Sequence, residues 1–186
     1  MMKARLMIAG AAALLSACGG GGDSESTTTT KPSLPSPTVL SASNGRTSDY
    51  IGTWASGCGT TLGSTVVRTV RNTYRITNAS GATASGTVEQ RQYSDTNCMT
   101  PWPSASFPPL TATVSIKVLG TSDVGTPTGS MDNFTGSADR VEVTTRPSGS
   151  SATTTIQFAA FSGNGTDFRF TDTLPFSALD LVYTKP

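Results

Sequence analysis

The side chains that most often carry acid–base and nucleophilic chemistry are scarce in this chain. It contains no histidine, which removes the commonest general base and the commonest metal ligand. Glu89 and Glu142 are the two glutamates of the region with strand-like patterning, and nothing in their spacing pairs them as the carboxylates of a glycosidase. The sequence thus offers no catalytic residue, and we predict a protein that is not an enzyme.

The first reactive group along the chain is the thiol of Cys18. Before it stand Lys3 and Arg5, an apolar run over residues 6–13, and the small residues Ser16 and Ala17. A positive start, a short apolar stretch and small residues are typical of a secretory signal. The apolar stretch is far shorter than the ~20 residues that a helix needs to cross a bilayer. We therefore predict that residues 1–17 are a removable signal peptide.

The run Leu15-Ser16-Ala17-Cys18 resembles the lipobox of bacterial lipoproteins. The resemblance implies cleavage after Ala17, a diacylglycerol on the sulfur of Cys18, and a third acyl chain such as palmitate on the freed amine. Because Gly19, and not Asp, follows the cysteine, the sorting rules of that family imply the outer membrane of the bacterial cell envelope. The membrane is then the expected partner of the chain, through the acyl chains on Cys18. An ordinary secretory signal with a chance cysteine is the alternative.

The two other cysteines are Cys58 and Cys98. The cell envelope permits disulfides, and we predict that these two residues pair. The bond would close a loop of about 41 residues, for which the chain-entropy model gives roughly 4 kcal/mol of stabilisation. Two free thiols are the alternative. Two cysteines without histidine cannot complete a tetrahedral metal shell, so neither a metal nor a cofactor is expected.

Composition divides the mature chain into a tether and one domain. Residues 18–46 begin with the predicted lipid-bearing cysteine and continue with Gly, Ser, Thr and Pro. Such a segment buries too little apolar surface to offset its ordering entropy, so we predict a disordered tether there. Residues 47–186 have the length of one domain. The chain has 13 Lys plus Arg against 12 Asp plus Glu, and the absence of a basic patch argues against nucleic acid as a partner.

The domain shows the period of two that is typical of half-buried strands. In residues 110–118, for example, apolar residues alternate with Thr, Ser and Lys. The pattern predicts an all-β fold, an antiparallel eight-stranded barrel, with a β-sandwich as the alternative. Short sequential turns favour the barrel, and closure removes exposed edges. The predicted strands are residues 50–56, 66–76, 82–93, 110–118, 138–145, 152–161, 166–172 and 179–184.

The run Gly52-Thr53-Trp54 at the first predicted strand of the domain is similar to the opening signature of lipocalins and the wider calycin group. The resemblance implies a lipocalin-like barrel in which Trp54 closes one end. It also implies that a basic residue near the end of the last strand packs across the indole ring. Lys185 is the corresponding residue here.

Six side chains are candidates for ligand binding inside or at the mouth of such a barrel. Arg68 falls on the apolar face of its strand, where it would meet a ligand carboxylate or one of the glutamates. Residues 99–109 form a proline-rich aromatic segment, whose side chains would gate the barrel mouth, anchor a partner, or plug the core. The six candidates are Trp54, Arg68, Tyr74, Trp102, Phe107 and Phe158.

Two functions fit these features. The first is an envelope lipoprotein whose barrel binds a small apolar or amphipathic ligand. The second is a non-enzymatic structural or protein-interaction module, with a packed barrel that presents a loop to another envelope protein. Eight strands leave room for one small ligand or for side chains alone, so the contents of the interior distinguish the two.

Overall fold

The computed structural model describes residues 36–62, 67–125, 134–162, 165–176 and 181–186. The predicted signal peptide, Cys18 and most of the predicted tether lie outside these residues. Within them the chain forms ten strands and one short 3₁₀ helix, η1 (Thr47–Tyr50). The strands are β1 (Thr38–Ser41), β2 (Gly52–Ser56), β3 (Gly59–Leu62), β4 (Val67–Ser80), β5 (Thr83–Tyr93), β6 (Leu110–Asp123), β7 (Phe134–Pro147), β8 (Thr153–Ser162), β9 (Asp167–Thr171) and β10 (Leu181–Thr184).

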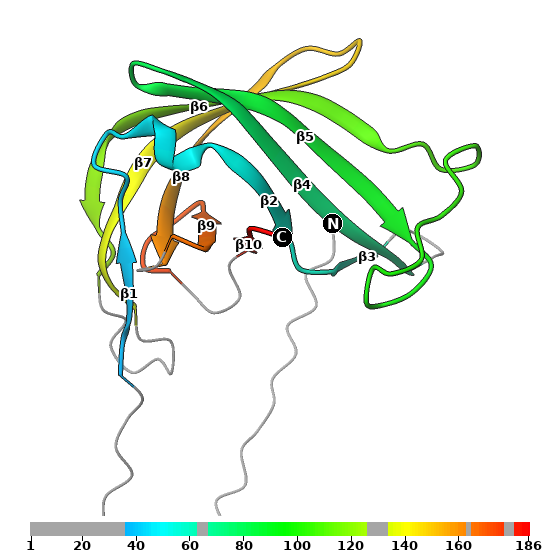
Figure 1. The fold of residues 1–186 in the computed structure, drawn as a ribbon, viewed down its shortest axis with the longest axis horizontal. Coiled ribbons are helices and arrows are strands. Elements are labelled where there is room, and N and C mark those ends of the chain that lie inside the picture. The colour runs from blue at the N-terminus through cyan, green and yellow to red at the C-terminus, as the bar shows by residue number, and fades with distance from the viewer. Residues whose placement is uncertain (1–35, 63–66, 126–133, 163–164, 177–180) are drawn as a thin grey trace, which may run out of the picture. The chain divides into compact units, whose positions relative to one another are not determined.

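All ten described strands belong to one sheet, which closes on itself because β2 pairs with β10 on one side and with β4 on the other. Nine strands form this ring. The tenth, β3, is not part of the ring and, within the described ranges, pairs only with the first residues of β4, residues 67–70 (Figure 1). Neighbouring strands are antiparallel, except that β1 runs parallel to β7. The predicted all-β class is confirmed, and each of the eight predicted runs overlaps a strand. β1 and β3 lie outside the predicted runs.

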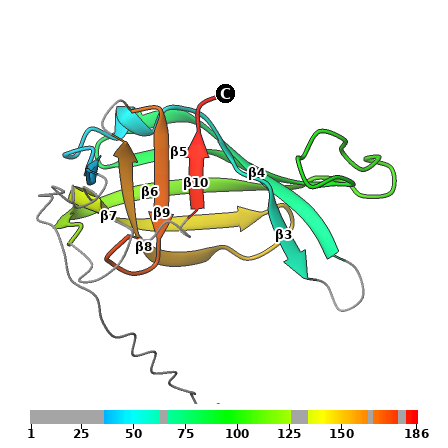
Figure 2. The same cartoon turned by 90° about the horizontal axis from the view of Figure 1, so that it is seen from below.

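The wall of the ring is long on one side and short on the other. β4, β6 and β7 have 14 residues each, whereas β2 and β9 have five and β10 has four. In Figure 2 the short strands β9 and β10 cross in front of the long strands of the opposite wall. Among the described residues, the long strands therefore extend beyond the short ones and leave one end of the ring partly uncovered.

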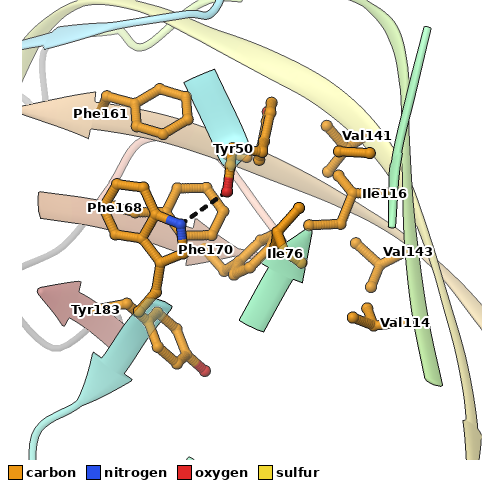
Figure 3. Close-up of a cluster of buried hydrophobic side chains, with 13 residues drawn as sticks. Tyr50, Ile76, Val114, Ile116, Val141, Val143, Phe161, Phe168, Phe170 and Tyr183 are labelled. Carbon is orange, nitrogen blue, oxygen red and sulfur yellow. Dashed lines mark hydrogen bonds between the residues drawn. The ribbon is translucent and has the colours of Figure 1, made fainter. Parts of the chain in front are cut away.

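The interior is filled by the inward-facing side chains of alternate strand positions, as the period of two requires. Aromatic rings dominate the side of the short strands, and Phe161, Phe168 and Phe170 pack edge-on or stacked with centroids 4.3–5.2 Å apart. Aliphatic side chains of β6 and β7 face them (Figure 3). The buried members are Tyr50, Trp54, Ile76, Ala84, Val114, Ile116, Val141, Val143, Ala159, Phe161, Phe168, Phe170 and Tyr183.

A second, smaller core lies on the other face of β8, where Ala160 alternates with the inward-facing Ala159 and Phe161. The predicted tether boundary at residue 46 is wrong, because β1 before that residue contributes a side chain to this cluster. Leu40 of β1 is buried in this second cluster, and β1 is hydrogen-bonded between β7 and β8. Residues 38–46 therefore belong to the folded domain. The cluster consists of Leu40, Val124, Phe134, Ala138, Ala160 and Phe176, with Phe158 and Leu174 at its edge.

Candidate functional site

One end of the ring is sealed by the segment that contains η1. The Trp54 indole is 1% exposed, and its Nε1 donates a hydrogen bond of 2.8 Å to the Tyr50 carbonyl. Lys185 Nζ lies 4.5 Å from the centre of the Trp54 ring, so the predicted contact between these residues is present. Gly52 leaves room for the lysine, because a Cβ at this position would lie 3.3 Å from Lys185 Cε.

A buried carboxylate holds the sealing segment in place. Asp139 of β7 is fully buried, and its Oδ2 accepts hydrogen bonds from the Ser43 backbone N–H, at 2.9 Å, and from the Tyr50 hydroxyl, at 2.7 Å. Burial raises the pKa of Tyr50, and the neighbouring Asp139 carboxylate raises it further. The phenol thus stays protonated and donates. This end of the ring is closed by packing and by a buried polar network.

The other end of the ring, its mouth, holds an open pocket of about 510 Å³, which we call the mouth pocket. Its walls come from the inward-facing positions of the long strands, where the short strands no longer cover them. Apolar side chains supply most of the inner wall. An amide pair supplies the polar part, because Gln90 Nε2 donates to Asn72 Oδ1 at 3.1 Å. The lining residues are Asn72, Tyr74, Val88, Gln90, Pro109, Leu110, Thr111, Ala112, Pro147, Ser148 and Ser150.

Two tyrosines form the boundary between the aromatic core and this pocket. The Tyr74 ring, which lines the pocket, meets the buried Tyr183 ring edge-on at a centroid distance of 5.1 Å. Burial raises the pKa of Tyr74. Burial also raises the pKa of Tyr183, and the Tyr74 side chain adds to that shift. Both phenols are therefore neutral at physiological pH, and the base of the pocket is an uncharged surface that can donate and accept hydrogen bonds.

The pocket walls carry no ionisable pair suited to acid–base catalysis among the described residues. No family model, curated protein or solved structure matches the chain. In the part of the chain that the structure describes, no helix is long and apolar enough to cross a membrane. Within the same ranges, no three metal-ligating side chains gather as a candidate ion site. The geometry of the pocket is therefore the basis for a functional assignment.

The structure brings one of the six predicted ligand-binding residues, Tyr74, into this pocket. Trp54 is buried at the sealed end, away from any ligand that enters the mouth. The assignment of Phe158 to the interior is wrong, since this side chain packs against the second cluster on the other face of β8. Arg68 pairs with Thr61 in the β3–β4 ladder, and its side chain lies outside what the structure describes.

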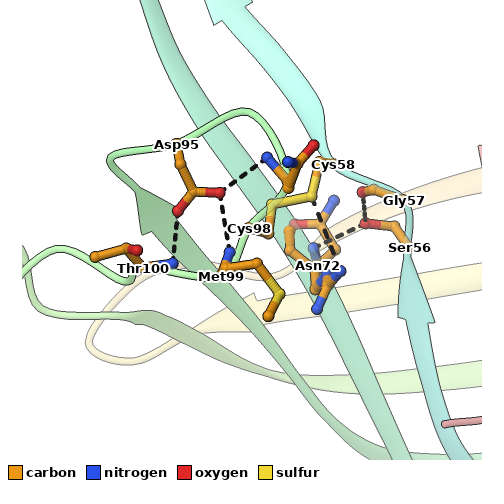
Figure 4. Close-up of a disulfide and its surroundings, with 10 residues drawn as sticks. Ser56, Gly57, Cys58, Asn72, Asp95, Cys98, Met99 and Thr100 are labelled. Atoms are coloured by element: carbon orange, nitrogen blue, oxygen red, sulfur yellow. Dashed lines mark hydrogen bonds between the residues drawn. A yellow bond between two sulfur atoms is a disulfide. The ribbon is translucent and has the colours of Figure 1, made fainter.

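The segment after β5 is organised by Asp95 and by the disulfide. The Asp95 carboxylate accepts hydrogen bonds from the backbone N–H groups of Asn97, Met99 and Thr100, and these bonds lower its pKa, that from Met99 most of all. The predicted Cys58–Cys98 disulfide is present, with the two Cα atoms 5.9 Å apart (Figure 4). The Asp95 hydrogen bonds and the disulfide therefore fix the conformation of this loop.

Trp102 and Phe107 pack on each other within this loop, with ring centroids 5.1 Å apart. Trp102 is 40% exposed, and its backbone N–H donates to the Gln92 carbonyl. Neither ring belongs to the two core clusters, so the prediction that they plug the core is wrong. Neither lines the pocket, whereas Pro109 at the end of the loop does.

Sequence reasoning missed Asn72, Gln90 and Asp139. The available signal was a polar residue on the apolar face of a strand. Asn72 falls in the same alternate register as Tyr74 and Ile76, and Asp139 in the same register as Val141. Such a residue needs a polar partner inside the fold, because burying an unpaired polar group is costly.

Proposed function

We propose that this chain is a non-enzymatic lipoprotein of the bacterial cell envelope whose lipocalin-like barrel binds one small apolar or amphipathic ligand. The observation that carries the proposal is the asymmetry between the two ends of the ring. One end is sealed by Trp54, Lys185 and the Tyr50–Asp139 pair, and the other opens into the pocket of about 510 Å³. That volume lies within the range of small-molecule sites.

The lining of the pocket defines the class of ligand. Val88, Ala112 and Pro147 offer apolar contact, while the Asn72–Gln90 amide pair and the Tyr74 phenol offer neutral hydrogen bonds. No charged side chain lines the pocket among the described residues. An apolar body with one uncharged polar group matches this lining, and an ionic headgroup does not.

A fluorescence titration tests ligand binding. The full chain with Cys18→Ser is titrated with N-phenyl-1-naphthylamine, an uncharged apolar probe, and we expect saturable binding with one site per chain. Ala112→Trp fills the mouth and is expected to abolish the signal. Ala79→Trp is the matched control, because Ala79 is half-buried near the β4–β5 turn and does not line the pocket. Equal binding by the two variants, or none by the parent, contradicts the proposal.

The proposed anchor is Cys18, which lies outside the described residues. The chain enters the fold at the end that is remote from the pocket, because Thr38 of β1 pairs with Phe134 at the start of β7, whereas Pro147 at the end of β7 lines the mouth. A tether that precedes β1 would therefore join the domain at the end opposite the pocket. Labelled palmitate should enter the wild-type protein in a bacterial host and not Cys18→Ser. A mature protein that begins at another residue contradicts the anchor.

A further inference from the structure

On the outer face of the ring, the sheet forks where β2 and β10 stop pairing. Their ladder ends at the pair Tyr183–Ser56. Beyond it the chain passes through Gly57 and Cys58 into β3, which follows β4, while Leu181 and Val182 pair with β9. Within the described ranges no pairing joins β3 to β10. The fork leaves a groove of about 450 Å³ between the two strands.

The groove faces away from the interior and from the mouth pocket. Val182 and Thr184 line it, and they alternate along β10 with Tyr183, which points into the core. Gly57 and Gly59 form the opposite rim, and a Cβ built at either would meet no atom within 4 Å. Another backbone can therefore approach this rim closely.

One charged side chain, Arg71 of β4, lines the groove among the described residues. Its Nη2 lies 3.8 Å from Cys58 Sγ, and its guanidinium carbon lies 6.0 Å from the centre of the Tyr93 ring. The Arg71 Nε is shielded from solvent and has no hydrogen-bond partner in the described part of the chain. These contacts fix the position of the guanidinium, and its Nε–H still lacks an acceptor among the described residues.

No carboxylate neutralises Arg71 within the described residues. The two ion pairs there are Arg46–Asp49 and Arg91–Glu89. Arg91 lies directly opposite Arg71 in the β4–β5 ladder, but its charge is paired with Glu89. Arg71 is therefore the positive charge of the groove lining that a bound carboxylate would neutralise, among the described residues.

We propose that this groove binds an extended acidic segment of a partner protein. Unpaired strand edges are templates for an added strand. Among the pairings of the described residues, the fork offers two such edges, one along β3 and one at residues 181–182 of β10. A Glu or Asp side chain of the added strand would receive paired N–H donors from Arg71, since a guanidinium matches a carboxylate in a bidentate manner. The Cys58–Cys98 disulfide fixes the glycine rim of the groove (Figure 4).

Fluorescence polarisation tests the proposal with the full chain carrying Cys18→Ser. The probe is a labelled pool of hexapeptides with Glu at the third position and random residues elsewhere. We expect the pool to bind, and we expect Arg71→Gln or replacement of the fixed Glu by Gln to weaken binding at least about tenfold, as loss of a hydrogen bond to a charged group does. Arg75→Gln is the control, because Arg75 lies on the same face of β4, is exposed, and does not line the groove.

Four results would overturn the proposal. The first is an absence of binding by the pool. The second is equal binding to the parent and to Arg71→Gln with an unchanged unfolding midpoint. The third is undiminished binding of the same pool with N-methylated backbone amides, which excludes strand pairing. The fourth is full displacement of the peptides by millimolar acetate, which makes the site one for free carboxylates. The mouth pocket lies elsewhere, so Ala112→Trp should leave peptide binding unchanged.

Discussion

The Tyr50 hydroxyl donates a hydrogen bond of 2.7 Å to Oδ2 of the fully buried Asp139. The two residues are 89 positions apart in the sequence, so the bond joins the segment before β2 to the middle of the β7–β8 wall. The bond fixes the segment that contains η1 across the sealed end of the ring. Because the acceptor is a carboxylate, the bond belongs to the stronger class of protein hydrogen bonds.

Removal of this hydroxyl should destabilise the fold. We expect Tyr50→Phe to lower the free energy of unfolding by about 1.5–3 kcal/mol, because the buried carboxylate loses a donor. Urea unfolding followed by tryptophan fluorescence measures the change. Tyr93→Phe is the control, since Tyr93 is half-buried outside both cores, and its effect should stay within about 0.5 kcal/mol. A similar loss in both variants would show that the Tyr50–Asp139 bond has no special role.

Stability should fall in alkali. Burial raises the pKa values of Tyr50, Tyr74 and Tyr183, so the folded chain keeps phenolic protons that the unfolded chain loses near pH 10. Their contribution is therefore complete below pH 10 and declines above it, by up to about 1.4 kcal/mol per pH unit for each tyrosine. Urea unfolding between pH 8 and pH 11 measures the slope. Tyr183→Phe should reduce it, and a flat profile would argue against buried phenols.

The contact between Lys185 and Trp54 should contribute measurably. Lys185→Met removes the charge from the face of the indole and should cost about 0.5–2 kcal/mol, whereas Lys185→Arg should retain most of the contact. Lys117→Met is the control, because the Lys117 side chain on β6 is exposed, and this variant should change stability little. Thermal unfolding of the three variants gives the comparison. The interpretation fails if both methionine variants lose the same stability.

A side chain at Gly136 should displace β1. The glycine has a φ of 112°, and a Cβ there would lie 2.0 Å from the Leu40 carbonyl oxygen. We expect Gly136→Ala to cost at least about 2 kcal/mol, from backbone strain and from loss of the β1–β7 pairing. Gly59→Ala is the control, because a Cβ at Gly59 meets nothing within 4 Å. Hydrogen exchange at Leu40 should rise in the first variant alone.

Loss of the disulfide should destabilise the domain without changing its fold. The sequence separation of 40 between Cys58 and Cys98 predicts a loss of about 2–4 kcal/mol in the double variant Cys58→Ser/Cys98→Ser. Denaturant unfolding of this variant and of the parent, with and without reductant, gives the value. Circular dichroism should report the same strand content. Reductant that shifts the variant as much as the parent would refute a role for the bond.

Strand identity could be read from the sequence, but strand orientation could not always be. Alternation in β6 is unambiguous, and Val114 and Ile116 face the interior as their pattern requires. In β8 the residues Phe158, Ala159, Ala160 and Phe161 are all apolar, because a second cluster covers the other face of this strand. A period of two gives no orientation when both faces are buried, so the pattern does not reveal that Phe158 faces the second cluster.

The sequence predicts that a ligand site lies inside the ring, but of the residues that line the pocket it identifies only Tyr74. A period of two indicates an inner wall, which includes Tyr74, but it does not reveal how far each strand extends. Among the described residues, the mouth of the ring is open because β4 has 14 residues and β10 has four, and no local pattern encodes that difference. β1 escaped prediction for a related reason. Its four residues lie in a Pro- and Ser-rich stretch, and tertiary packing of Leu40 overrides that composition.

The position of β1 also has a mechanical consequence. The strand holds the first paired residues of the described chain, and it lies between β7 and β8. Tension applied ahead of Thr38 along the strand axis would be borne as shear by both ladders together, so their hydrogen bonds would have to break in concert. A domain that is pulled through β1 should therefore resist mechanical unfolding from its amino-terminal strand.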